Sequence, residues 1–525
     1  MKPLRLSAVT LWFSVFCAAC FAANPPDWYY TEGSLRGSLK SDGPLPLYDA
    51  DANHLWNRLF AVFYIRPSEL PSRPNEYPTD PTQLDEYDHK ARRGELAPGP
   101  VVKRIEGGDT MNFLAWPKTR YFFEPANFER ENKLLDEFIE KHGEQLIADP
   151  LKRALLQRDL WIVFDHLINQ NIARFGLPKV ASRRASVSDY EIRTDELQFD
   201  GEAAMQRREI LGRKLAVIIK GLALPKSAIK SLPNNYSAAV RSSYFSPAAR
   251  FNYRHNYLPP DLFSKPDEWV EIDSSPEPLH TDKHEGQIDY VAWSNRGRSY
   301  YRIYFRFPEG RKAVEDYLKY LQQEGVDWQK SARQGFIALK PGVAQIPAGT
   351  ETAIIEFMIA LDDQLEAVPT EIVESARTSI YKNVTGKLDP ETNTGRGVSF
   401  RAYVLRRRLL FDNLNQGGLE RLADDAPTYA VLLNGQHDWG NSARQQSVIQ
   451  SCLACHMHEK TRVGVFSLNT IFCFAPDGGM PGIVTPMGSG EIRPYPRAQR
   501  VARWKMGQED YLRLAEYARA LTAAR

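Results

Sequence analysis

The residues of this chain that could do chemistry together lie near its carboxyl end, in Ser451-Cys-Leu-Ala-Cys-His456. Thiols and imidazoles can bind metals or form covalent links, and their spacing decides which use fits. A CxxC pair followed directly by histidine is the attachment signature of haem c, in which each thiol adds across a vinyl group and the imidazole reaches the iron. The stretch therefore predicts one covalent haem on Cys452 and Cys455, with His456 as the proximal iron ligand.

The same region allows two other sites. Cys452, Cys455, His458 and Cys473 have the types and spacing of four tetrahedral ligands of structural zinc. Cys452 and Cys455 could instead form a redox-active disulfide. Haem is favoured because a zinc site has no need of a histidine directly after the second cysteine. Four-ligand thiolate sites are also less usual among exported proteins than in the cytosol.

The distal iron ligand has several candidates. Met487 in Thr-Pro-Met-Gly is the first choice and Met506, just before the final predicted helix, is the second. Met480, His458, His437 or an open position remain as alternatives. Methionine ligation raises the reduction potential and favours electron transfer, whereas an open iron favours ligand binding or peroxide chemistry.

The motif and its flanks resemble the c-type cytochromes over residues 420–525. In the small cytochrome c fold, a helix leading into CxxCH crosses a C-terminal helix, and the haem lies beneath the crossing. Residues 443–450 predict the first helix, and residues 508–524 predict the second, with Tyr511 and Leu514 on its apolar face. The resemblance implies a mainly-α haem domain that transfers single electrons.

The amino terminus predicts export. Lys2 and Arg5 precede an apolar run that ends in small residues, so residues 1–23 are typical of a secretory signal peptide. Lipid attachment at Cys20 is the alternative. The run is short for a retained bilayer span, so we expect no transmembrane segment in the mature chain. A periplasmic or otherwise exported protein would meet the machinery that attaches haem in bacteria.

Composition limits the partners. The chain is 43% hydrophobic and 25% charged, which is typical of a globular protein. Removal of the signal peptide takes two positive charges from a net charge of +2, and a neutral chain argues against nucleic acid or an anionic membrane as partner. Only three cysteines then remain, too few for a disulfide framework. The expected partner is an unidentified redox protein or a small-molecule electron donor or acceptor.

The 525 residues predict about two to four domains. Residues 24–117 are rich in proline and tyrosine and predict an extended segment, with one helix near residues 51–63. In residues 118–284, apolar side chains recur every three to four positions, which predicts a helical region.

Residues 285–415 predict a small α+β region. Apolar side chains alternate in residues 299–307, and residues 352–361 predict a second strand. Arg302 and Arg306 fall on the polar side of the first strand, so we expect them on a solvated sheet face. The run Arg406–Arg408 predicts another charged surface. The whole chain thus predicts a helix-rich α+β fold, with a large N-terminal module and a mainly-α, cytochrome c-like C-terminal domain.

The sequence carries no other catalytic signature. It has no GxxxxGK[ST], HExxH or GxSxG, and no GxGxxG after a predicted strand, so common nucleotide, zinc-protease and serine-hydrolase sites are not indicated. One-electron transfer is therefore the favoured function. A secreted oxidoreductase that uses the haem as a built-in electron acceptor is the alternative, and whether the protein is an enzyme stays open.

Overall fold

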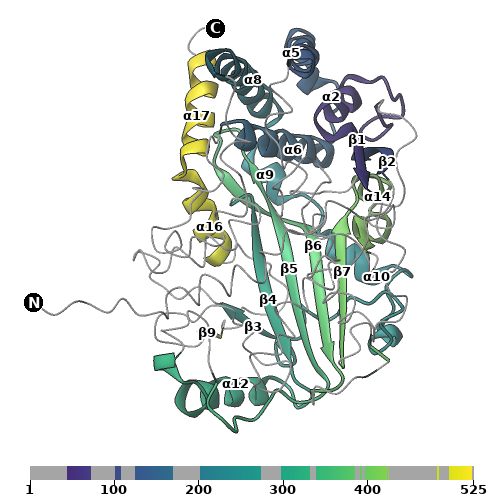
Figure 1. Ribbon diagram of the computed structural model, residues 1–525, viewed down its shortest axis with the longest axis vertical. Coiled ribbons are helices and arrows are strands. Elements are labelled where there is room, and N and C mark those ends of the chain that lie inside the picture. The colour runs from purple at the N-terminus through teal and green to yellow at the C-terminus, as the bar shows by residue number, and fades with distance from the viewer. Residues whose placement is uncertain are drawn as a thin grey trace, which may run out of the picture.

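A computed structural model describes 44–71, 101–107, 125–168, 201–273, 297–330, 339–384, 389, 391–392, 397–422, 424, 482–483 and 496–522. The predicted signal peptide, Cys20 and the CxxCH stretch lie outside these residues. The described part is α+β, which confirms the predicted class (Figure 1). None of its helices is both long and apolar enough to cross a membrane.

A seven-stranded antiparallel sheet organises this part of the chain (Figure 1). Its spatial order is β8-β7-β6-β5-β4-β3-β9, so β8 and β9 form its two edges. The strands are β3 (Val270–Asp273), β4 (Ser299–Arg306), β5 (Thr350–Leu361), β6 (Ala367–Tyr381), β7 (Val398–Leu405), β8 (Leu419–Arg421) and β9 (Gly482–Ile483).

The two longest strands, β5 and β6, form a hairpin. β5 contains three isoleucines, two threonines and one phenylalanine, residues that favour a pleated surface. The turn is closed by Asp362, whose Oδ1 accepts hydrogen bonds from the backbone N–H groups of Gln364 and Glu366 at 2.9 and 2.8 Å. This confirms the strand predicted for residues 352–361.

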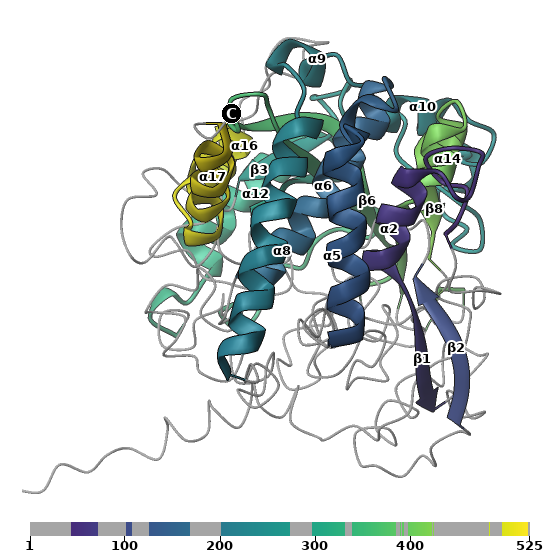
Figure 2. The same cartoon turned by 90° about the horizontal axis from the view of Figure 1, so that it is seen from above.

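Four helices lie side by side over one end of the sheet, as Figure 2 shows: α2 (Leu55–Tyr64), α5 (Pro125–Glu140), α6 (Pro150–Ile168) and α8 (Gly201–Leu222). Helix α6 is the central one, since it contacts both α8 and β5 and is buried from Ala154 to Phe164. The other helices are η3 (Gly143–Gln145), α9 (Lys226–Lys230), α10 (Asn235–Arg241), η5 (Pro247–Ala249), α12 (Arg311–Tyr320), η6 (Leu321–Gly325), α14 (Arg407–Phe411), η7 (Asn415–Gly418), α16 (Pro496–Met506) and α17 (Glu509–Thr522).

The region predicted to be extended contains more regular structure than expected. Helix α2 confirms the helix predicted near residues 51–63. The strands β1 (Ile65–Pro71) and β2 (Val101–Gly107) were not predicted, and they pair with each other antiparallel.

Strand β4 is buried on both faces. Tyr300 and Tyr304 belong to the main core under the helices, whereas Phe305 belongs to a second core around α12. The prediction of a solvated face on this strand was therefore wrong. Alternation identifies the two faces of a strand, but the cover over each face comes from distant parts of the chain.

The C-terminal helices belong to the main core. The helix predicted over residues 508–524 is α17, and it packs on α8 and α6, while α16 packs on β4 and β6. Val501 and Leu514 are fully buried in the same core as the N-terminal helices. Residues 496–522 thus share one core with residues of the predicted N-terminal module.

Candidate functional site

The predicted haem site falls between two described points of the chain. Cys452, Cys455, His456 and Met487 lie outside the described residues, as do His458 and Cys473. Strand β8 precedes the motif at one edge of the sheet and β9 follows it at the other. With neighbouring strands about 4.8 Å apart, the connection that carries the motif joins points about 29 Å apart across the seven strands.

Met506 is the one predicted iron ligand that the structure places. It ends α16 and is half-buried against the main core. Within the described ranges, no group of three or more His, Cys, Asp or Glu side chains is arranged to hold a metal ion.

The described residues do bring together a cluster of buried charges, which we call the α6 charge cluster. It comprises Arg158, Asp165, Arg298, Ser299, Glu356, Glu374, Ser375, Lys505 and Asp510. These side chains are at most 2% exposed and come from α6, from the start of β4 and the residue just before it, from β5 and β6, and from the two C-terminal helices.

The first half of the cluster joins α6 to the sheet. Arg158 Nη2 lies 3.1 Å from Glu374 Oε1 and donates a hydrogen bond of 3.0 Å to Ser299 Oγ. The Ser299 hydroxyl in turn donates to Glu374. Next to Glu374 on β6, Ser375 Oγ donates to Glu356 Oε2 of the neighbouring strand β5 at 2.6 Å.

A β-bulge explains why two carboxylates meet here. Glu356 pairs with Ser375 but the next residue, Phe357, pairs with Val373, so Glu374 is the extra residue on β6. An extra residue re-aims the side chains of the bulged strand. Consecutive residues Glu374 and Ser375 therefore both reach partners in the cluster, which strict alternation would not allow.

The environment of Glu374 changes its acidity. Its pKa is about 7, above the ordinary 4.5. Burial is the largest cause of this rise and Glu356 adds to it, whereas Arg158, Ser299 and Arg298 oppose it. A buried carboxyl beside a like charge binds a proton more tightly than in water. Glu374 therefore changes protonation near neutral pH. Residues with a shifted pKa of this kind are often found at functional sites.

The second half of the cluster holds the C-terminal helices. Asp165 of α6 accepts from Arg298 and, at 2.7 Å, from Lys505 Nζ. Lys505 also donates to Asp510 of α17 at 2.5 Å, and its ammonium lies 5.6 Å from the centre of the Trp161 ring. Burial raises the pKa of Asp510. These ion pairs fix α16 and α17 to α6 and β4.

A separate buried pair corrects a second sequence prediction. Arg407 was expected on a charged surface, but it is 0% exposed and donates to Asp159 Oδ2 through Nε at 2.9 Å. The Tyr48 hydroxyl donates to the same Oδ2 at 2.8 Å. The partners are 248 positions apart, so no local pattern could have paired them.

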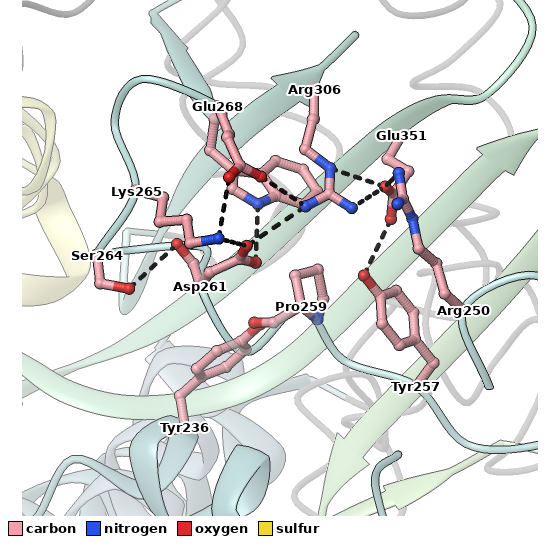
Figure 3. Close-up of polar contacts among 11 residues, drawn as sticks. Tyr236, Arg250, Tyr257, Pro259, Asp261, Ser264, Lys265, Glu268, Arg306 and Glu351 are labelled. Carbon is pink, nitrogen blue, oxygen red and sulfur yellow. Dashed lines mark hydrogen bonds and ion pairs between the residues drawn. The ribbon is translucent and has the colours of Figure 1, made fainter. Parts of the chain in front are cut away.

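Arg306 is also paired, not solvated. Figure 3 shows its guanidinium between Glu351, at 2.8 Å from Nε, and two acids beyond Nη1, Asp261 at 3.4 Å and Glu268 at 3.3 Å. Tyr257 donates to Glu351 from the other side at 3.0 Å. Every member of this group has a partner of opposite charge or a hydrogen bond, which is the pattern of a structural network.

Arg302 is also held in an ion pair. Its Nε and Nη2 donate to the two oxygens of Glu271 at 2.9 and 2.7 Å, and its guanidinium lies over the rings of Phe263 and Tyr304. A guanidinium in a bidentate pair between aromatic rings has no free face for an anionic ligand.

The proton on Glu374 predicts a pH-dependent stability. The folded pKa of about 7 exceeds the ordinary 4.5, so the folded state binds more protons than the unfolded state between these values. The free energy of unfolding should fall as pH rises through this window, by on the order of 3 kcal/mol. Glu374→Gln should flatten that slope in urea unfolding at several pH values. An unchanged slope would show that Glu374 does not bind this proton.

The α6 charge cluster was not predicted from the sequence. One signal was present: polar residues, among them Arg158, Asp159 and Asp165, interrupt the apolar stretch of α6. Charged residues in such a run are buried only when partners meet them.

No family model, curated protein or solved structure matches the chain.

Proposed function

We propose that this chain is an exported c-type cytochrome-like protein that carries one covalent haem and transfers single electrons. The observation that carries the proposal is Cys452-Leu-Ala-Cys455-His456. A leader typical of export supports it, because bacterial haem attachment takes place outside the cytoplasm.

The donor set fits haem c. Cys452 and Cys455 would form the two thioether links, and His456 would bind the iron through one ring nitrogen while the other is oriented by a hydrogen bond. When bound, haem supplies reversible one-electron oxidation and reduction. The residues of the chain keep the group attached and set its environment.

Met487 is the proposed distal ligand. Met506 already packs against the main core at the end of α16, next to the buried Lys505. Removing it from that position would expose apolar surface and disturb the α6 charge cluster. Its packing role therefore favours Met487.

The large helical and sheet part would present the haem to its partner. That partner is a redox protein or a small-molecule donor or acceptor. The near-neutral charge of the chain supports a partner recognised by shape and apolar contact more than by strong opposite charge.

An absorption spectrum tests the proposal. Protein made in a host with haem-attachment machinery should show sharp Soret and α bands, and the colour should stay with the protein in acidified acetone. A colourless protein with one bound zinc per chain would instead favour the site at Cys452, Cys455, His458 and Cys473. Binding of carbon monoxide to the reduced form would indicate an open sixth position and favour the oxidoreductase alternative.

A further inference from the structure

A carboxyl group lies in the middle of the apolar face of α5. Phe128, Leu134, Leu135 and Phe138 form this face and belong to the main core. Because a helix turns by about 100° per residue, Glu131 falls at the centre of the same stripe. Its side chain is 0% exposed. An apolar residue would satisfy the packing here, so the carboxyl calls for another explanation.

Neither oxygen of Glu131 has a hydrogen-bond partner in the part of the chain that the structure describes. Basic side chains approach α5 from both neighbouring helices, but other acids hold them. Arg58 of α2 donates to both oxygens of Glu137 at 2.8 and 2.7 Å. Lys214 of α8 pairs with Asp136. Both cations thus form ion pairs with other acids of α5 and not with Glu131.

The remaining charged neighbours do not compensate Glu131. Arg130 lies on the exposed side of α5. Glu144, in the short helix η3, has its Oε1 at 3.5 Å from Nδ1 of His142. Burial raises the pKa of Glu131 well above its usual range, and Arg130 opposes this only in part. An uncompensated carboxylate in an apolar core neutralises by keeping its proton.

We propose that Glu131 is a proton-binding site that controls the docking of α5 on α2 and α8. With its proton, the carboxyl is neutral and stays among the apolar side chains. When a base in solution takes that proton, the carboxylate is driven toward water and α5 separates from its neighbours. One proton moves from the carboxyl oxygen to the base, and no other bond changes.

The direction of the pH effect follows from the sign of the shift. A folded-state pKa above the ordinary value makes the folded chain bind the proton more tightly, so docking weakens as pH rises. Between the ordinary pKa of 4.5 and the raised folded pKa, opening of α5 should increase about tenfold for each pH unit, and above the folded pKa it should level off.

Hydrogen exchange of the full chain, read by mass spectrometry over residues 125–140, tests the proposal. After correction for the intrinsic exchange rate, wild-type protection of α5 should be highest in mildly acidic solution and should fall as the pH rises through neutral to alkaline values. Glu131→Gln is neutral at every pH and should keep its protection. Glu131→Leu should do the same and serves where the glutamine variant does not fold.

Glu137→Gln is the matched control on the same helix. Hydrogen bonds from Arg58 and Lys141 hold the pKa of Glu137 at about 2, so this carboxyl does not titrate in the range tested. The control should lose protection with rising pH as the wild type does. Alkaline loss of protection in Glu131→Gln or Glu131→Leu equal to that of the wild type would overturn the proposal.

Discussion

Replacing both Cys452 and Cys455 by serine is expected to abolish covalent haem completely. A serine hydroxyl cannot form the thioether link, so the double variant should lose its colour to acidified acetone while the wild type keeps it. Each single variant should keep one link and reduced haem content. The measurement is the visible spectrum, with the mass of the peptide that contains residues 452–456.

Cys473→Ser separates the haem hypothesis from the zinc hypothesis. Cys473 has no role in haem attachment, so this variant should retain full haem content and an unchanged spectrum. In a zinc site Cys473 would be a ligand, and its loss should lower the bound metal. Haem content that is independent of Cys452 and Cys455 would contradict the proposed function.

Asp165→Asn is expected to cause the largest loss of stability among changes in the described region. Asp165 neutralises both Arg298 and Lys505, which are at most 2% exposed. Removal of one partner leaves buried positive charge, at a cost of about 3–5 kcal/mol in the free energy of unfolding. Urea unfolding measures this loss, and limited proteolysis should show early cleavage in α16 and α17.

Asp316→Asn provides the control for this change. Asp316 pairs with Lys312 on α12, but both side chains are exposed, at 62% and 82%. Exposed pairs of this kind contribute about 0.3–0.5 kcal/mol. Equal small losses in the two variants would mean that the charges of the α6 cluster are not buried in solution.

Local sequence patterns predicted helices and strands correctly, but they did not predict which residues pack on each face. The alternation in β4 and the apolar spacing in α5 gave the correct strand and helix. The same alternation led to a wrong expectation for Arg302 and Arg306, because a period describes the faces of one strand only. Glu271 and Glu351, which neutralise these arginines, come from other strands of the sheet.

The bulge in β6 is a second feature that could not be predicted from the sequence. A shift of one residue between Glu356 and Phe357 decides that Glu374 enters the α6 charge cluster. Propensities are nearly the same for a regular and a bulged pairing, so the choice depends on the partners that the side chains find.

The α+β class, most of the helices and the one motif with an indicated chemistry could be predicted from local patterns in the chain. These features depend on residues a few positions apart, and spacing along the chain is enough to recognise them. Which charges are buried, and which partners neutralise them, depends on contacts between distant parts of the chain. Arg158 meets Glu374 across 216 positions and Arg407 meets Asp159 across 248, and such contacts exist only after the core has closed around them.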